Sequence, residues 1–402
     1  MAQTTIQEIF SDYLTKKPLF LNKSALGDNY LPENIAHREE QIRQLSIILA
    51  PTLNQEKPSN IFIYGSTGTG KTLVTKHVTS ELNKIAEKNN IVVSVFYVNC
   101  KMKRVADTEY RLLAYLCELL GKNVPATGLP TDSVYKAFYS AIEERKGVVL
   151  LIIDEIDALI KKIGDDFLYN LTRINQNLMN VKCSIIGISN DLSFTDYLDA
   201  RVRSSLSEEE LIFPPYNAMQ LQEILRERSK VAFSADKNYD GVIAKCAALA
   251  AQEHGDARRA IDLLRVAGEL AERNGDTQVD ESHVSQAEDK VDSDRILDAI
   301  KTQPKQTKAV IYSVFLKLKE NERLVLTGEV YDEYKTACKK LSLKILTQRR
   351  FSDILSEIDL LGIINARIIS KGRYGRMREI TSSVSDDLRK KVILCLKEEF
   401  YF

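Results

Sequence analysis

The feature that most constrains this chain is a glycine-rich segment, Gly65–Thr72, which reads Gly-Ser-Thr-Gly-Thr-Gly-Lys-Thr. A short apolar run, Asn60–Tyr64, precedes it, and a helical pattern begins at Lys71. Glycines let the backbone wrap a phosphate, and the start of a helix adds partial positive charge. The spacing fits G-x-x-x-x-G-K-[ST], in which the Lys reaches the β- and γ-phosphates and the Thr binds Mg²⁺. We therefore predict that ATP or ADP is bound by this segment and the residue after it, namely Gly65, Ser66, Thr67, Gly68, Thr69, Gly70, Lys71, Thr72 and Leu73.

An acidic pair follows a second apolar run, Val148–Ile153. Ligands of open α/β sheets bind at the carboxyl ends of the strands. Asp154 is therefore predicted to hold Mg²⁺ together with Thr72. Glu155 is the candidate that orients and activates the attacking water, whereas Asp157 is expected to cap the following helix. The two motifs predict ATP and Mg²⁺ binding with slow hydrolysis, and a fast enzyme is not expected.

Short apolar runs alternate with longer helical patterns from about residue 58 to residue 213. The runs are rich in Ile and Val, which is typical of strands buried on both faces of a parallel sheet. This alternation predicts a doubly wound α/β sheet. The expected strands are Asn60–Tyr64, Ile91–Val98, Gly147–Ile153, Cys183–Ile188 and Glu209–Phe213, and the expected helices are Lys71–Glu87, Asp107–Leu120, Asp132–Arg145 and Asp166–Met179.

Two prolines, Pro214 and Pro215, end this alternation, and only helical patterns follow to about residue 290. The last part of the chain combines helices with a probable hairpin. We therefore predict three domains: an α/β nucleotide-binding base (1–213), a helical lid (214–292) and a C-terminal domain (293–402).

Charge is divided unevenly along a chain that is neutral as a whole, with 56 Lys and Arg against 56 Asp and Glu. Residues 1–300 carry 35 basic and 43 acidic side chains, a net charge of −8, and residues 301–402 carry 21 and 13, a net charge of +8. A basic excess in one part of a chain is typical of contact with nucleic acid or a membrane. No apolar run approaches the ~20 residues that span a bilayer, and the first residues do not resemble a signal peptide. We expect a cytoplasmic, nucleoid-associated protein with no membrane partner, whose six scattered cysteines are reduced thiols.

The C-terminal domain has the element order of a winged helix. Helices are expected at 304–320, 327–341, 346–360 and 385–398, with strands at Ile363–Ile369 and Arg376–Thr381. The first residues of a recognition helix meet base edges, and a basic hairpin tip contacts phosphates or a minor groove. Because fold alone does not settle function, a protein-binding basic face remains open. The predicted DNA contacts are Thr347, Gln348, Arg349, Arg350, Lys371, Arg373 and Arg376.

With these motifs in place, the chain resembles an AAA+ ATPase, and more narrowly the archaeal origin-recognition and cell-division-control initiator family. The resemblance spans nearly the whole chain. It is carried, in order, by residues 30–33, 37–39, 58–61, 97–100, 151–157, 188–191, 201–206, 213–216 and 255–260.

The resemblance implies roles for residues outside the phosphate loop. Asn190 is similar to sensor 1, which touches the γ-phosphate or the attacking water, and Arg258 is similar to sensor 2. Arg259 must face elsewhere, because adjacent helical residues diverge, and we expect it in a surface salt bridge. Tyr216 is expected to pack its ring on adenine at the hinge between base and lid, and Arg228 to face the same nucleotide.

Two further features follow from the resemblance. Arg201 resembles the arginine finger that completes a neighbour's site, although Ser205 stands where the eukaryotic pattern has another Arg. The family also contacts DNA through a helical insertion after the second strand, which would lie within residues 101–125 and contains Lys101, Lys103, Arg104 and Arg111.

Together these features imply an ATP-dependent replication initiator. It would bind double-stranded origin DNA, recruit the MCM helicase, act beside paralogous initiators, and use slow hydrolysis as a switch. Two alternatives remain open. One is an ATP-gated winged-helix transcription regulator. The other is a clamp-loader-like remodelling ATPase, which Ser205 disfavours because such an assembly requires a working finger.

Overall fold

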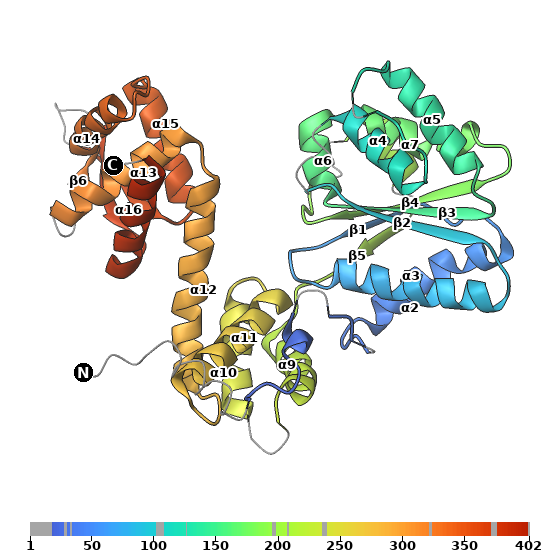
Figure 1. The fold of residues 1–402 in the computed structure, drawn as a ribbon, viewed down its shortest axis with the longest axis horizontal. Helices are drawn as coiled ribbons and strands as arrows, with labels where there is room; N and C mark the ends of the chain where they lie inside the picture. Colours follow the sequence, from blue (N-terminus) through green and yellow to red (C-terminus); the bar gives the residue numbers. More distant parts are fainter. Residues whose placement is uncertain are drawn as a thin grey trace, which may run out of the picture. The chain divides into compact units, whose positions relative to one another are not determined.

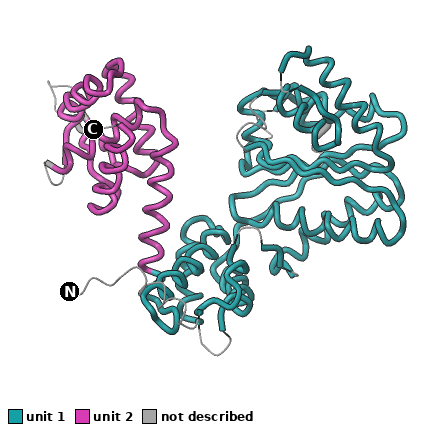
Figure 2. The backbone as a smooth tube through the Cα atoms, in the orientation of Figure 1, with its two compact units in different colours: residues 1–284 teal, residues 285–402 magenta. Residues whose placement is uncertain are grey.

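The computed structural model describes residues 18–27, 30–32, 34–101, 108–125, 127–194, 198–206, 209–234, 239–320, 324–370 and 376–400. The chain forms two compact units, residues 1–284 and residues 285–402 (Figure 2). All six cysteines are free thiols. Within the described parts of the chain, every helix is too short or too polar to cross a membrane.

A parallel five-stranded sheet forms the centre of the nucleotide-binding base. Its strands are β1 (Ile61–Tyr64), β2 (Val93–Asn99), β3 (Val148–Asp154), β4 (Lys182–Ser189) and β5 (Glu209–Ile212). They lie in the order β2-β3-β4-β1-β5, and every neighbouring pair is parallel. Because β4 lies between β1 and β3, the segments that follow β1 and β3 flank the end of β4. The doubly wound α/β fold is confirmed.

Helices cover both faces of this sheet (Figure 1). Helices α2 (Glu39–Leu49) and α3 (Lys71–Lys88) lie on one face, and α4 (Glu109–Leu119), α5 (Thr131–Glu143), α6 (Ile156–Ile163) and α7 (Asp166–Thr172) lie on the other. Successive side chains of a strand point to opposite faces. In β3, Leu150 and Ile152 accordingly pack in the α2–α3 core, whereas Leu151 and Ile153 pack in the other core.

One predicted helix is shorter than expected. The pattern at 166–179 predicts a single helix, but α7 ends at Thr172 and a 3₁₀ turn, Ile174–Gln176, follows. The Asn175 amide explains the break, because it donates to the Cys183 carbonyl (2.7 Å) and accepts from the Cys183 N–H (2.8 Å). Asn175 thus ties this segment to β4. The sequence analysis also predicted no helix at the position of α2.

The described residues after the sheet form helices α9 (Ala218–Ala232), α10 (Asp240–Gln252), α11 (Ala257–Asn274) and the start of α12 (Glu281–Thr302). An N-terminal segment packs against them. The Phe20 and Phe233 rings stack with centroids 4.9 Å apart, and the Leu21 N–H donates to the Ala232 carbonyl. This segment lies within the range predicted for the base, yet its contacts are with the lid helices. The boundaries between the three predicted domains remain predictions.

The second unit is a winged helix, as predicted. Its helices are α13 (Lys305–Glu320), α14 (Thr327–Lys340), α15 (Gln348–Leu360) and α16 (Asp386–Phe400). Strands β6 (Val325–Leu326), β8 (Arg376–Ser382) and β7 (Ile364–Ser370) form an antiparallel sheet in that order. The rings of Tyr334, Phe351 and Phe315 are fully buried in its core. Ser370 of β7 pairs with Arg376 of β8, and this is the pair nearest the hairpin tip.

Candidate nucleotide site and nucleic-acid interface

The glycine-rich loop connects β1 to α3. Gly68 (φ +72°) and Gly70 (φ +90°) have left-handed backbones, which favour glycine. A Cβ atom on Gly68 would lie 1.7 Å from a carboxylate oxygen of Asp256, and one on Gly70 would lie 2.9 Å from the Tyr216 hydroxyl. Gly70 is also the N-cap of α3 and has no side chain with which to satisfy the first N–H groups of that helix. The loop therefore offers backbone donors for an anion, which fits a nucleotide phosphate.

Lys71 is buried at the start of α3, where its side chain is held by the loop. Its Nζ donates to the carbonyls of Gly65 (2.7 Å) and Ser66 (2.8 Å). Burial lowers the pKa of Lys71 to about 8; the negative charge of Asp154 opposes this change, and the positive charge of Arg258 adds to it. A buried cation at this position suits a polyphosphate ligand.

Asp154 lies at the end of β3, and both of its carboxylate oxygens accept hydrogen bonds. Its Oδ2 accepts from the Thr72 hydroxyl (2.8 Å) and from the Tyr97 hydroxyl (2.6 Å), and its Oδ1 accepts from the N–H of Glu155 (2.9 Å). Burial, followed by the hydrogen bond to Asp154, raises the pKa of Tyr97, so this hydroxyl stays a donor. A carboxylate beside a hydroxyl is the donor set that Mg²⁺ uses in nucleotide sites. The sequence interpretation missed Tyr97, although this residue lies near the end of an expected strand and in one of the blocks that carry the resemblance.

Glu155 lies between β3 and α6 in a left-handed conformation, with φ 58° and ψ 43°. This conformation is uncommon for residues other than glycine and is typical of functional sites. The predicted role of Asp157 is wrong. Glu155 is the N-cap of α6, and Asp157 lies inside that helix. The Asp157 carboxylate instead accepts from the Ser189 hydroxyl (3.2 Å) and the Asn190 N–H (3.4 Å), and so fastens the end of β4.

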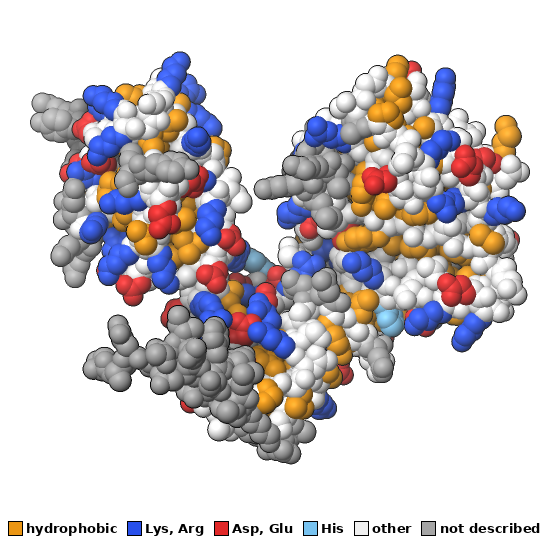
Figure 3. All heavy atoms as spheres, in the orientation of Figure 1, with side chains coloured by type: hydrophobic (Ala, Val, Ile, Leu, Met, Phe, Trp, Pro, Cys, Tyr) orange, Lys and Arg blue, Asp and Glu red, His pale blue; other side chains and the backbone are white. Residues whose placement is uncertain are grey.

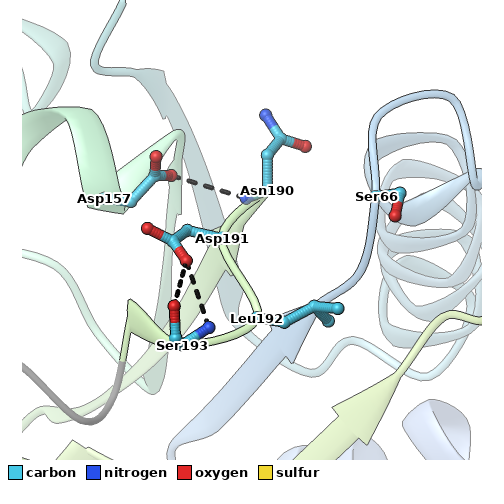
Figure 4. A pocket seen from close by; sticks show the side chains of 6 residues that line it. All are labelled: Ser66, Asp157, Asn190, Asp191, Leu192 and Ser193. Carbon is cyan, nitrogen blue, oxygen red and sulfur yellow. Dashed lines mark hydrogen bonds between the residues drawn. The ribbon is translucent and has the colours of Figure 1, made fainter.

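Asn190 directly follows β4, between the segments that carry the loop and Asp154. An open depression lies beside it, and its amide extends away from the Asp157 carboxylate (Figure 4). The residues that line the depression are Ser66, Asp157, Asn190, Asp191, Leu192 and Ser193. The strand order thus brings predicted sensor 1 to the same edge as the glycine-rich loop.

The start of α11 contacts the glycine-rich loop directly. The Ala257 N–H donates to the Gly68 carbonyl (3.2 Å), and Asp256 caps α11 by accepting from the N–H of Arg258 (2.8 Å) and of Arg259 (3.3 Å). Arg258 is exposed, and its charge reaches Lys71, whose pKa it helps to lower. Arg259 forms the expected salt bridge, with Glu253 (3.3 Å). The Glu253 side chain is 43% exposed, whereas that of Arg259 is 9% exposed.

Tyr216 and Arg228 lie in different surroundings. The buried Tyr216 ring stacks on the guanidinium of Arg38, 3.8 Å from the ring centroid. Arg228 donates to the Ala25 carbonyl (3.1 Å) and lies 4.5 Å from the Tyr30 ring centroid, so these contacts are with the N-terminal segment. Sequence reasoning assigned no role to Arg38, although it lies in one of the blocks that carry the resemblance.

Arg201 lies at the start of α8 (Ala200–Leu206), and its side chain is 71% exposed. It forms a two-point pair with Asp199, at 3.0 and 3.1 Å, and lies 5.4 Å from the Tyr169 ring centroid. The side chain of Ser205 is outside the described residues.

The predicted DNA contacts on α15 are at the surface. Thr347 is the N-cap of this helix, Gln348 and Arg349 are exposed, and Arg350 pairs with Glu357 (3.3 Å). On the face drawn in Figure 3, Lys and Arg side chains are spread over this unit. Several predicted contacts lie outside the described residues, namely Lys371, Arg373, the side chain of Arg376, Lys103 and Arg104.

Three family models match successive parts of the chain. An AAA domain matches residues 54–193, a Cdc6 AAA+ ATPase-type lid domain matches 222–289, and a CDC6 C-terminal winged helix domain matches 298–392. Among solved structures, the Aeropyrum pernix ORC1 protein in complex with DNA has a TM-score of 0.83 and 42% identity, over 94% of this chain and 97% of that one. The Drosophila ORC bound to DNA, at 20% identity and a TM-score of 0.59, shares the fold.

Curated relatives extend this similarity over nearly the whole chain. The ORC1-type DNA replication protein of Thermococcus onnurineus is 52% identical over 389 residues, which cover 96% of this chain and 93% of that protein. ORC1-type DNA replication protein 1 of Methanosarcina mazei is 50% identical over 392 residues, which cover 97% and 94%. With an AAA+ nucleotide site, a Cdc6-type lid and a winged helix in one chain, this protein belongs to the ORC1-type DNA replication protein family.

Proposed function

We propose that this chain is an ATP-dependent initiator of DNA replication. The observation that carries the proposal is the contact between the glycine-rich loop and the start of α11, where Ala257 donates to Gly68 and the charge of Arg258 reaches Lys71. It joins the residues predicted to bind phosphate to a helix of the lid. A nucleotide bound at the loop would therefore bias the position of the lid.

Each residue of the site has a separate task in this proposal. Lys71 and the first N–H groups of α3 bind the β- and γ-phosphates, and Thr72 and Asp154 hold Mg²⁺. Mg²⁺ supplies charge neutralisation at the phosphates when it is bound. Glu155 and Asn190 orient the attacking water, and Arg258 contacts the γ-phosphate. Hydrolysis is slow and serves as a switch between states.

In this proposal the winged helix binds double-stranded origin DNA. The exposed start of α15 is suited to a major groove, and the basic residues of the hairpin are suited to phosphates. The DNA complex of the 42%-identical Aeropyrum pernix ORC1 supports this assignment. Bound protein would then recruit the MCM helicase, alone or beside paralogous initiators.

Mapping the chromosomal sites that this protein occupies tests the proposal. We expect enrichment at one or a few replication origins and loss of MCM loading there when Lys71→Ala replaces the native protein. Enrichment at many promoters without any origin would instead support an ATP-gated transcription regulator. Nucleotide-dependent binding to a protein ring, without DNA binding, would support a remodelling ATPase.

A further inference from the structure

Arg38, the N-cap residue of α2, is only 2% exposed and lies beside the glycine-rich loop. Each of its three guanidinium nitrogens donates to a backbone carbonyl. Nε donates to Thr69 (2.9 Å), Nη1 to His37 (2.9 Å) and Nη2 to Pro214 (2.6 Å). Burying a cation is costly unless its hydrogen bonds are satisfied. Arg38 therefore joins the loop to the segment that leads from the sheet into the lid.

The same guanidinium lies over the ring of Tyr216. The separation of 3.8 Å between the Arg38 Cζ and the ring centroid is a close stack, which the planar guanidinium favours over an ammonium. The far end of Tyr216 abuts the loop, with its hydroxyl 2.9 Å from the position that a Cβ on Gly70 would take. Tyr216 is thus fixed between Arg38 and the loop.

The backbone of Tyr216 also meets the turn before α11. Its N–H donates to the Gly255 carbonyl (3.4 Å), and a Cβ on Gly255 would lie 2.3 Å from the Tyr216 carbonyl oxygen. Two residues later, Ala257 donates to Gly68. Arg38 therefore contacts both the glycine-rich loop and the segment Pro214–Tyr216. That segment contacts the turn before α11, and the start of α11 contacts the loop again.

We propose that Arg38 is a positioning residue of the nucleotide site, and that Arg38 and Tyr216 act as one unit that holds the glycine-rich loop against the lid. In this arrangement Tyr216 supports the phosphate-binding backbone and is not a platform for the adenine base. The inference rests on the proposed function, because the ligand concerned is the Mg·ATP bound at the loop. Arg38 contacts backbone carbonyls and the Tyr216 ring, and it affects ligand binding through these groups.

A double-mutant cycle tests this unit in the full chain. The variants are Arg38→Met, Tyr216→Leu and the two combined, and the probes are Mg·ATP and Mg·tripolyphosphate, measured by displacement of a fluorescent ADP. We expect each single change to weaken both probes about ten-fold or more, and the double change to be no worse than the poorer single variant. Additive losses, or a loss confined to Mg·ATP, would overturn the proposal.

Conservative variants keep the test valid where a larger change impairs folding. Arg38→Lys keeps the charge but has one nitrogen in place of the three guanidinium nitrogens that reach separate carbonyls. It should therefore bind both probes as weakly as Arg38→Met, with a retained circular-dichroism spectrum. Wild-type binding by Arg38→Lys would contradict the proposal. Arg43→Met, with a side chain 71% exposed on the same helix, is the matched control and should change nothing.

Lys71→Ala in the same assay distinguishes the positioning role of Arg38 and Tyr216 from the assignment of the nucleotide site. If Lys71→Ala abolishes binding while the Arg38 and Tyr216 effects are additive, only the positioning role fails. If Lys71→Ala binds normally, the assignment of the nucleotide site fails as a whole.

Discussion

At the scale of single residues, the nucleotide site depends on groups that are buried and already hydrogen-bonded. The Lys71 amine is held by two loop carbonyls, and the Asp154 carboxylate by two hydroxyls and one N–H. Such groups are positioned before a ligand arrives, so less ordering is needed on binding. Their removal should therefore affect affinity more than stability.

Replacing Lys71 with Ala should reduce affinity for Mg·ATP by about 100-fold or more, because a charged hydrogen bond to phosphate is lost in a buried site. Isothermal titration calorimetry measures the change. Lys84→Ala is the control, since Lys84 lies on the same helix with a side chain that is 63% exposed. Unaltered affinity in Lys71→Ala would refute the site assignment.

The lowered pKa of Lys71, about 8, predicts a pH dependence of nucleotide binding. The charged amine attracts phosphate, and above pH 8 most of the free protein carries a neutral amine. Binding must then take up a proton, so affinity should fall from pH 8 towards pH 9. Calorimetry in two buffers with different ionisation enthalpies measures this proton uptake.

Lys71→Arg should remove this pH dependence, because a guanidinium stays protonated. Proton release on binding by the native protein would contradict the prediction. The same pKa also bears on stability. The unfolded chain keeps the proton to about 10.5, so the contribution of Lys71 to the free energy of unfolding rises with pH between about 8 and 10.5.

At the scale of elements, the decisive contact is between the glycine-rich loop and the start of α11. Gly68 accepts from Ala257, and the Asp256 carboxylate occupies the space that a side chain on Gly68 would need. A substitution in the glycine-rich loop at Gly68 is therefore expected to disturb the start of α11 as well. This contact explains in part why only glycine fits at that position.

Gly68→Ala should destabilise the first unit by more than the roughly 1–2 kcal/mol of left-handed strain, because the new methyl group also collides with Asp256. It should also reduce the stabilisation that Mg·ADP provides. Thermal denaturation with and without Mg·ADP measures both effects. Gly121→Ala is the matched control, since Gly121 has φ +82° and a Cβ there would meet only the end of the Arg145 side chain. Equal effects of the two substitutions would show that the contact with Asp256 is unimportant.

At the scale of the whole molecule, the net charge of zero conceals two oppositely charged parts. Residues 1–300 have a net charge of −8 and residues 301–402 a net charge of +8. Non-specific attraction of the whole chain to DNA is therefore modest. Specific contacts by α15 and the hairpin must supply more of the affinity.

Replacing Arg373 and Arg376 together with Ala should weaken DNA binding and reduce the slope of log affinity against log salt by about 2, since each lost phosphate contact removes ~0.9. Fluorescence anisotropy over a salt series measures the slope. Lys390→Ala with Lys397→Ala on α16 is a control of equal charge. An unchanged slope in the hairpin variant would favour a protein-binding role for this unit.

Much of this protein could be predicted from its sequence, because the relevant signals are local. Glycine spacing and the following helix identified the phosphate loop, and strand–helix alternation predicted the parallel sheet. In the second unit, α13 to α16, β7 and β8 begin and end within two residues of their expected positions. These patterns depend on backbone conformation and periodicity, which neighbouring residues determine.

The tertiary structure alone decided which distant residues meet. Arg38 bonds Pro214 across 176 positions, and Tyr97 bonds Asp154 across 57. Asp157, predicted to cap a helix, instead fastens the end of β4. The physical reason is the strand order. Placing β4 between β1 and β3 brings three separate segments to one edge of the sheet, and no local pattern encodes that order.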